Sequence, residues 1–172
     1  MGMKFAYADP PYFKQGKRLY GKLHAEAEIW DTEQSHLDLI ARLYADYPDG
    51  FALSCNPADL SWILPKYPDL RICVWAKTFH LIKPVTNQYA WEAVLLHGGR
   101  TVYKRKPMVR DWISCARSMR KGLVGAKPLT FNNWVLDLLN YQEGDVIDDL
   151  FPGTNGLSEA IKLRHAEKGI YA

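Results

Sequence analysis

Four consecutive residues near the N-terminus, Asp9, Pro10, Pro11 and Tyr12, combine groups that can bind an exocyclic amine. The two prolines fix successive φ angles and carry no N–H, so the segment is stiff and its carbonyl oxygens are free to accept hydrogen bonds. Asp9 adds a charged acceptor, and Tyr12 adds an aromatic ring. A base inside a duplex is out of reach and must be flipped out to meet such a pocket. We therefore predict a pocket here for the amino group of a purine or pyrimidine.

A second polar segment, DDLFPGTNG at residues 148–156, has an acidic start, two glycines and a predicted helix directly after it. Glycines let a ligand approach the backbone closely, and a helix start offers unpaired N–H donors. The segment lacks the G-x-x-x-x-G-K-[ST] string that binds nucleoside triphosphates. Its acidic start suits a cationic cofactor better than a pyrophosphate. It predicts a cofactor-binding loop of a kind that many Rossmann-like proteins share.

The positive charge of the chain is concentrated in one segment, residues 100–121. The whole chain has 22 Lys and Arg and 19 Asp and Glu, a net charge of +3. The segment contains eight cations and one acid, Asp111, so it carries +7 and the remaining residues carry −4. Such an excess is typical of a surface that meets phosphates, with a merely solvated surface as the alternative. The cations are Arg100, Lys104, Arg105, Lys106, Arg110, Arg117, Arg120 and Lys121.

We interpret residues 100–121 as a long loop with a short strand near residues 109–114, and as a candidate nucleic-acid-recognition insertion. A smaller basic group, Lys14, Lys17 and Arg18, follows Tyr12 directly. It predicts a second contact to nucleic acid, in a loop over the substrate. A plain solvated loop is the alternative for this group.

Short apolar runs alternate with amphipathic segments, which predicts strands separated by helices. The strands are expected at residues 4–8, 51–55, 71–76, 90–96 and 145–150. The helices are expected at residues 32–44, 57–64, 129–139 and 157–167. This order predicts an α/β fold with a mostly parallel, doubly wound sheet covered on both faces. Ligands of such sheets bind beyond the carboxyl ends of the strands, and both polar segments directly follow a predicted strand.

Length and composition exclude several classes of protein. With 172 residues, of which 48% are hydrophobic and 24% charged, the chain predicts a single globular domain over residues 1–172. No apolar run reaches the roughly 20 residues that span a membrane, and the first residues lack the layout of a signal peptide. The cysteines Cys55, Cys73 and Cys115 have no metal-type spacing. We expect a reduced, cytoplasmic protein with no metal site and no membrane segment.

The two polar segments together resemble the methyltransferases that modify the N6 amine of adenine. In that family D-P-P-[YFW] is the catalytic motif and D-x-F-x-G-x-G is the S-adenosylmethionine motif, matched here at residues 9–12 and 149–155. The catalytic motif comes first, as in the permuted β-class DNA enzymes and the related MT-A70-like proteins. Weaker matches are W-x-K and E-x-x-L at residues 75–77 and 92–95, and K-P at residues 127–128. The resemblance covers residues 4–165 and is closest to short phage-type enzymes.

The resemblance implies a Rossmann-like methyltransferase sheet, with S-adenosyl-L-methionine as cofactor. Asp9 and the Pro10 carbonyl would accept hydrogen bonds from the adenine amine, and Tyr12 would stack on the flipped base. The methyl group would pass directly to the amine, so neither a catalytic cysteine nor a metal is required. The residues that would hold the cofactor are Ala8, Asp9, Lys127, Pro128, Asp149, Phe151, Gly153, Asn155 and Gly156.

The resemblance also implies a bacterial or phage-encoded enzyme that acts on DNA in the bacterial cytoplasm. Two alternatives stay open: the same reaction on RNA, and a nucleic-acid-binding relative that does not turn over. N4-cytosine transfer is disfavoured, because those enzymes more often carry Ser in place of Asp9.

The chain departs from the family pattern at two places. Asn155 stands at the second glycine of the cofactor motif, although Asn tolerates the left-handed conformation better than most residues. No strand fits between Gly169 and Ala172, so we expect the sheet to lack the outer strands that follow the cofactor-loop helix. Another residue would then bind the cofactor ribose, or the affinity is low, or a homo-oligomer completes the site.

Overall fold

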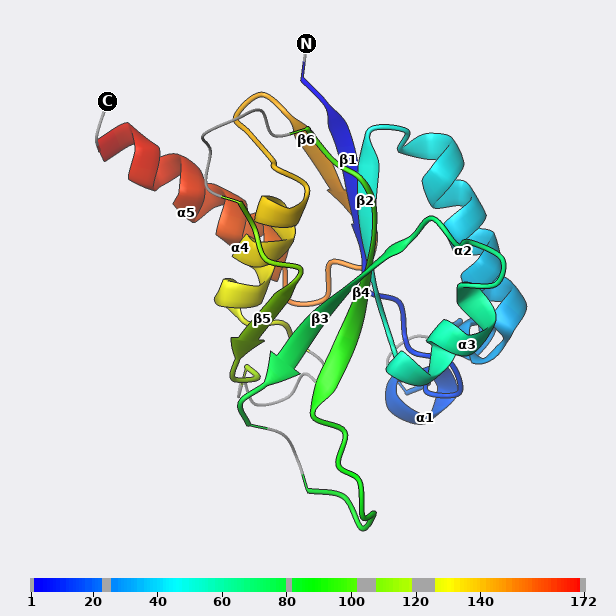
Figure 1. Ribbon diagram of the computed structural model, residues 1–172. Coiled ribbons are helices and arrows are strands. Elements are labelled where there is room, and N and C mark those ends of the chain that lie inside the picture. The colour runs from blue at the N-terminus through cyan, green and yellow to red at the C-terminus, as the bar shows by residue number, and fades with distance from the viewer. Residues whose placement is uncertain (1, 23–25, 80–81, 102–107, 119–125, 171–172) are drawn as a thin grey trace.

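The computed structural model describes residues 2–22, 26–79, 82–101, 108–118 and 126–170. For residues 167–170 it describes the backbone only. Within these residues six strands form one sheet (Figure 1). The strands are β1 (Lys4–Ala8), β2 (Gly50–Cys55), β3 (Arg71–Lys77), β4 (Trp91–Gly98), β5 (Trp112–Cys115) and β6 (Val146–Asp149). Their order across the sheet is β5-β3-β4-β2-β1-β6.

The sheet is mostly parallel, as predicted, and β4 is the reversed strand among those described. β1 pairs in parallel with both β2 and β6, and β3 pairs in parallel with β5. β4 is antiparallel to both of its neighbours, β2 and β3. A parallel neighbour needs a crossover connection, which is usually a helix. The described part of the β3–β4 connection holds no helix, which is consistent with the return of β4 in the opposite direction.

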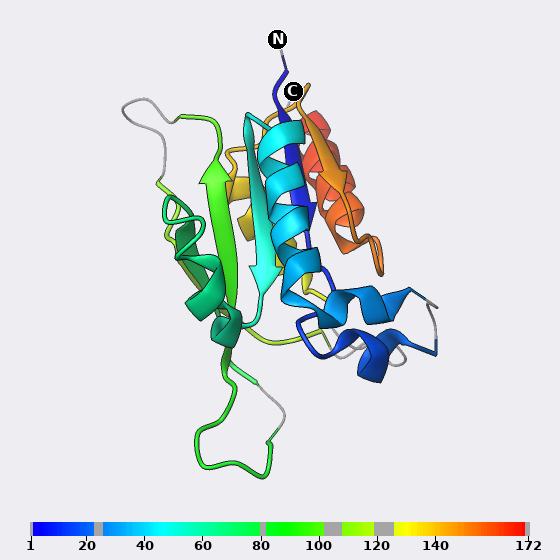
Figure 2. The same ribbon diagram turned by 90° about the vertical axis from the view of Figure 1, so that its right-hand side faces the viewer.

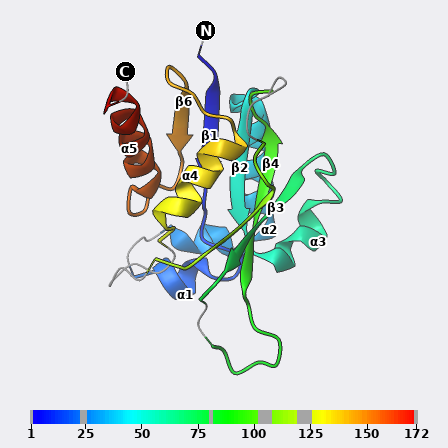
Figure 3. The same cartoon turned by 60° about the vertical axis from the view of Figure 1, so that its left-hand side comes forward.

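Helices cover both faces of the sheet, so the predicted doubly wound Rossmann-like architecture is confirmed (Figures 1 and 3). One face is covered by α2 (Glu33–Asp46) and α3 (Leu60–Ile63), and the other by α4 (Leu129–Leu138) and α5 (Gly156–Ile170). The short helices α1 (Gly16–Tyr20) and η1 (Ala27–Asp31) lie near the end of the sheet where β1 and β2 end (Figures 1 and 2). A further short helix, η2 (Pro57–Asp59), precedes α3. No helix in the described part of the chain is long and apolar enough to cross a membrane.

β1 runs through the middle of the core and is fixed on both faces. Phe5 and Tyr7 belong to the apolar cluster under α4 and α5, whereas Ala6 and Ala8 belong to the cluster under α2 and α3. All four side chains are almost completely buried. Because β1 also has hydrogen-bonded strands on both edges, the residue that follows it, Asp9, leaves the sheet from a rigid position.

The predicted elements are found with boundaries shifted by a few residues at most. Thr32 begins α2 as expected, and its hydroxyl accepts the Ser35 amide at 3.3 Å. The short strand expected at residues 109–114 is β5, which lies at residues 112–115 and forms an edge of the main sheet. The basic segment is therefore part sheet in its described residues. The described chain ends with α5.

Candidate active site

The two polar segments picked out in the sequence meet at the same end of the sheet. β1 and β6 are parallel neighbours, with Tyr7 opposite Asp149, so the turns that follow them leave the sheet side by side. The Leu150 amide donates to the Tyr7 carbonyl at 3.0 Å, which continues this pairing beyond β6. The carboxylates of Asp9 and Asp149 consequently lie around one cavity.

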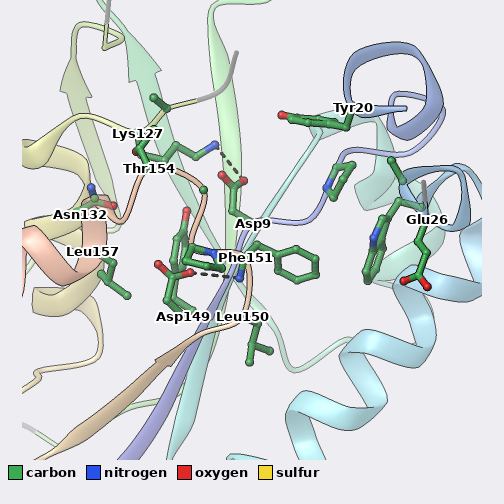
Figure 4. Close-up of a pocket in the computed structure, with 18 residues that line it drawn as sticks. Asp9, Tyr20, Glu26, Lys127, Asn132, Asp149, Leu150, Phe151, Thr154 and Leu157 are labelled. Atoms are coloured by element: carbon green, nitrogen blue, oxygen red, sulfur yellow. Dashed lines mark hydrogen bonds and ion pairs between the residues drawn. The ribbon is translucent and has the colours of Figure 1, made fainter. Parts of the chain in front are cut away.

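This first cavity has a volume of about 530 Å³. Figure 4 shows Asp149 and Thr154 on one side, Tyr20 and Glu26 on the other, and Asp9 and Phe151 between them. The described residues that line it are Tyr7, Asp9, Pro11, Tyr20, Glu26, Ala27, Trp30, Ala126, Lys127, Asn132, Asp149, Leu150, Phe151, Pro152, Gly153, Thr154, Gly156 and Leu157. Its charged lining consists of three carboxylates and one lysine, so it is net acidic.

The turn between β6 and α5 packs closely against the rest of the first cavity. Gly153 and Asn155 both adopt positive φ angles, 48° and 57°, so Asn155 does take the left-handed conformation anticipated for it. A Cβ atom on Gly156 would come within 2.7 Å of the Asn132 side-chain amide, so a larger residue at the start of α5 would require the Asn132 side chain to shift. The Phe151 amide donates to Asp149 at 3.3 Å. Burial raises the pKa of Asp149 to about 6, and the charge of Asp9 adds to this shift.

A second cavity, also of about 530 Å³, lies on the other side of Asp9. Three residues line both cavities: Asp9, Tyr20 and Lys127. The other described residues that line it are Pro10, Tyr12, Gln15, Arg18, Leu19, Asn56, Pro57, Lys77, Lys83, Pro84, Val85, Tyr89, Trp91, Glu92 and Arg117. With five cations and two carboxylates this lining is net basic, the reverse of the first cavity.

Lys127 joins the two cavities through a buried network of charges. Its ammonium lies 3.0 Å from Asp9 Oδ1 and 2.9 Å from Glu92 Oε2, and its side chain is only 8% exposed. Lys77 forms an ion pair with the other oxygen of Glu92. The Tyr12 hydroxyl donates to Glu92 Oε2 at 2.6 Å. Two lysines thus balance two carboxylates, which is the condition for keeping charges in a buried site.

The network sets the protonation state of its members. Burial alone would raise the pKa of Glu92, but Lys127 and Lys77 outweigh it and hold the pKa at about 2. Burial would lower the pKa of Lys127, but Asp9 and Glu92 hold it well above its ordinary value. For Asp9 the balance is different, because burial raises its pKa more than Lys127 lowers it. Asp9 is therefore the group of the network whose carboxylate gains a proton most readily.

The fold of the chain matches solved structures, although no protein-family profile matches the chain and no curated protein matches its sequence. The structure of M1.HpyAVI in complex with SAM matches with a TM-score of 0.62 and 17% identity, over 94% of this chain and 78% of that one. The chain has the methyltransferase fold. TTHA0409 from Thermus thermophilus, a candidate DNA modification methylase, matches in two structures, one a selenomethionine derivative and one in complex with S-adenosyl-L-methionine. Both have a TM-score of 0.51, with 16% and 18% identity over 92% of this chain and 75% and 76% of theirs.

Within this methyltransferase fold the predicted catalytic segment lies at the junction of the two cavities. Pro11 faces the first cavity, Pro10 and Tyr12 face the second, and Asp9 faces both. The hydroxyl of Tyr12, to which the sequence assigned no role, is held by Glu92 and also lies 3.2 Å from the Lys127 ammonium.

Most of the residues predicted to hold a cofactor line the first cavity, and three do not. Asp9, Lys127 and the turn residues Asp149, Phe151, Gly153 and Gly156 are among its lining residues. Ala8 is fully buried in the core under α2, so its side chain does not reach the cavity. Pro128 precedes α4 as its N-cap, and Asn155 supplies a turn in the backbone. These three positions support the lining without forming it.

Sequence reasoning assigned no role to Lys77 and Glu92, although both fall in the weaker W-x-K and E-x-x-L matches. The available signal was a charged residue directly beside the apolar run of a strand, as at the end of β3 and the start of β4. Tyr20, Glu26 and Trp30 line the first cavity from α1 and the η1 region. No sequence pattern marked these three residues.

The predicted nucleic-acid contacts divide into several groups. Arg18 and Arg117 line the second cavity. Lys14 and Lys17 lie on the exposed surface before and within α1, and Lys17 pairs with Glu28 at 3.2 Å. Arg110 lies over the exposed ring of Trp112 at 5.8 Å, at the edge strand. Lys104, Arg105, Lys106, Arg120 and Lys121 lie outside the described residues.

Arg100 does not belong with the other basic residues. It follows the carboxyl end of β4, and because β4 is reversed this end lies beside the start of β2, at the opposite end of the sheet from both cavities. Its guanidinium pairs there with the buried carboxylate of Asp145. Arg100 thus forms a structural ion pair at the opposite end of the sheet from both cavities, and its contact with nucleic acid stays a prediction.

Proposed function

We propose that the protein transfers a methyl group from S-adenosyl-L-methionine to the N6 amine of an adenine in DNA. The observation that carries this proposal is the position of Asp9 on the wall between a net acidic and a net basic cavity of equal size. A methyl donor and a methyl acceptor have to meet at one point, and Asp9 and Lys127 are at the point where these cavities meet. The match to structures of methyltransferases in complex with this cofactor supports the proposal.

The first cavity has the charge and volume to hold the cofactor. S-adenosyl-L-methionine is a cation at its sulfur, and the carboxylates of Asp9, Glu26 and Asp149 give the cavity the complementary sign. A volume of about 530 Å³ is within the usual range for a small-molecule site. The cofactor, when bound, supplies an electrophilic methyl group. Asp149 and the backbone of residues 151–156 would hold it, with Lys127 at the boundary to the second cavity.

The second cavity would receive the flipped adenine, since its walls carry the groups predicted for an amine. The Asp9 carboxylate and the Pro10 carbonyl accept hydrogen bonds from the two N6 hydrogens, and the carboxylate draws electron density toward the nitrogen. The raised pKa of Asp9 makes it a suitable acceptor for the proton that the amine releases. Lys127 and Glu92 hold Asp9 and Tyr12 in place, so catalysis rests on positioning and on charge.

The proposal is tested with cofactor that carries a labelled methyl group, offered with unmodified DNA and, separately, with unmodified RNA. We expect label on DNA, and N6-methyladenine when that DNA is digested to nucleosides. Asp9→Ala should abolish labelling, whereas Asp38→Ala, which removes an exposed carboxylate on α2, should leave it unchanged. Label on RNA alone would assign the reaction to RNA, and label recovered as N4-methylcytosine would exclude adenine as the target.

Calorimetry separates the enzyme from a relative that only binds nucleic acid. Wild-type protein that releases heat with cofactor but labels neither polymer would contradict transfer while keeping the cofactor site. Absence of both heat and label would refute the whole proposal. Labelling that survives in Asp9→Ala would instead refute the assignment of Asp9.

A further inference from the structure

The loop between β3 and β4 projects beyond the sheet at the end where the two cavities lie (Figures 1 and 2). The structure describes residues 78–79 and 82–90 of this loop, and several of them are apolar side chains without cover. Ile82 is 87% exposed and Tyr89 is 64% exposed, and Phe79 and Val85 are also exposed. Apolar side chains grouped in this way on one projecting loop are typical of a contact surface.

The tip of the loop is held in one shape by the side chain of Gln88. The Lys83 amide donates to Gln88 Oε1 at 2.8 Å, and Gln88 Nε2 donates back to the Lys83 carbonyl at 3.0 Å. Gln88 Nε2 also donates to the Val85 carbonyl. A tip closed by its own hydrogen bonds loses little conformational freedom when it inserts into a partner.

One side of the same tip forms a wall of the second cavity. Lys83, Pro84 and Val85 line that cavity together with Tyr12 and Trp91. The exposed apolar side of the loop is thus directly next to the space proposed for the flipped base. A base that enters the cavity would leave an empty place in its duplex close to this tip.

The charges around the tip favour a polyanion over a second protein. Arg18, Lys83 and Arg117 line the cavity, and none of them forms an ion pair with a described residue. The carboxylates Asp9 and Glu92 are already balanced by buried lysines. The surface that surrounds the apolar tip is therefore cationic, as is required near a phosphate backbone.

We infer that the segment from Ile82 to Val85 inserts into the DNA duplex beside the target and fills the place that the flipped adenine leaves. Side chains such as Ile and Pro act as wedges between base steps in proteins that distort DNA. Lys83, between Ile82 and Pro84, contacts a phosphate during insertion. This inference rests on the proposed function and adds to it the element that opens the duplex.

The test compares a duplex that must be opened with substrates that are already open. The variant Ile82→Ser removes the most exposed apolar side chain of the described loop and leaves the lining of the second cavity unchanged. The control, Leu163→Ser, removes an exposed apolar side chain from α5. Each protein is assayed for methyl transfer to a matched duplex, to a duplex with a mismatch at the target adenine, and to the single strand.

We expect the loop variant to lose about tenfold or more in kcat/KM on the matched duplex and to stay within about twofold of wild type on the mismatched duplex and the single strand. The control should match wild type on all three. Equal activity of the loop variant and wild type on the matched duplex would overturn the inference. So would a loss of the same size on all three substrates, because a wedge has no task in an open substrate.

A second measurement keeps the two proposals separate. A 2-aminopurine placed at the target position brightens when it leaves the base stack, so it reports flipping without methyl transfer. The wedge is supported if the wild-type protein brightens the probe and the loop variant binds the same DNA without brightening it. This holds even if no methyl group is transferred. Equal brightening by both proteins overturns the wedge while the proposed function stands. If the wild type forms a dimer and the loop variant does not, the tip contacts a second copy of the chain. That result would also overturn the inference.

Discussion

The two cavities that meet at Asp9 have the same volume and opposite charge. The first is lined by Asp9, Glu26 and Asp149 against a single lysine, and the second by five cations against Asp9 and Glu92. The difference follows from the elements that form them. The acidic residues of the first cavity follow β1, end β6 or directly precede η1. The basic residues of the second lie in α1, at the end of β3, in the loop after β3, after β5 and before α4.

This difference explains how a chain with a net charge of only +3 can suit two ligands of opposite charge. The charge is divided between two sides of one wall, so the total says little about either side. The buried network of Lys77, Glu92, Lys127 and Asp9 is what allows these sides to be close together, because it neutralises the wall itself.

Lys127→Met should give the largest effect, because it removes the cation that both cavities share. Asp9 and Glu92 would then be buried close together without it, and loss of a buried partner of this kind destabilises a protein by about 3–5 kcal/mol. We expect a clear fall in Tm and no methyl transfer, whereas Lys66→Met on the surface should change neither. Adding Asp9→Asn should restore part of the lost stability, and a double variant no more stable than Lys127→Met would contradict the ion-pair account.

Glu92→Gln should affect the function of the second cavity and leave that of the first unchanged, because Glu92 lines only the second. The change leaves the Tyr12 hydroxyl and Lys77 without their charged partner, so the base side of the site loses its alignment. We expect kcat/KM for DNA to fall by up to about 100-fold while the cofactor Kd from calorimetry stays the same. Glu143→Gln, on the surface, is the control. Weakening of cofactor binding by the same factor would show that the two cavities are not distinct.

Asp149→Asn should act on the first cavity alone and remove a pH dependence. The pKa of Asp149 is about 6, and a cation prefers the ionised carboxylate, so cofactor affinity should rise about tenfold between pH 5 and pH 7. The effect of Asp149 on the free energy of unfolding changes with pH in the opposite direction. Its pKa is about 6 in the folded protein and about 3.9 in the unfolded chain. The stability that Asp149 contributes is therefore fully present below about pH 3.9 and is lost as the pH rises through about 6. Calorimetry over this range should give a flatter profile for Asp149→Asn, while Asp148→Asn keeps the rise. A wild-type Kd that does not change with pH would count against Asp149 as a ligand.

Tyr12→Phe should give the smallest effect, since it removes one hydroxyl and keeps the ring. Glu92 retains both lysines, so the free energy of unfolding should fall by about 1 kcal/mol, and the activity by a few fold. Tyr44→Phe, which loses a hydrogen bond to the exposed Asp69, should cost no more. A loss in Tyr12→Phe as large as that in Glu92→Gln would mean that the hydroxyl does more than hold the ring.

The sequence predicted most of the fold, because the apolar runs and the turn residues are local signals. Residues 4–8 form a buried strand with Asp-Pro-Pro as its stop, and the Thr32 cap marks the start of α2, and both can be identified from the adjacent residues alone. The direction of β4 was harder, because it depends on which neighbours the strand joins. The position of Arg100 has the same cause, since the reversal of β4 places this residue at the opposite end of the sheet from both cavities.

The sequence predicted the two motifs of the candidate site but not the contacts between the residues that join them. The segments at Asp9 and Asp149 are continuous in sequence and could be identified directly. The contacts of Lys127 with Asp9 and Glu92 join residues 118 and 35 positions apart, and no local pattern encodes such a distance. The exposure of Ile82 is a property of the folded surface and is equally invisible in the sequence.

The wall that Asp9, Tyr20 and Lys127 share makes the two cavities one thermodynamic system. An occupant of either cavity changes the electrostatic surroundings of the same three side chains, so it changes the affinity of the other. Linkage then requires the effect to be reciprocal: the factor by which one ligand alters the binding of the second is the factor by which the second alters the binding of the first. In this fold a coupling between the two ligands follows from a shared boundary, without any movement of a domain.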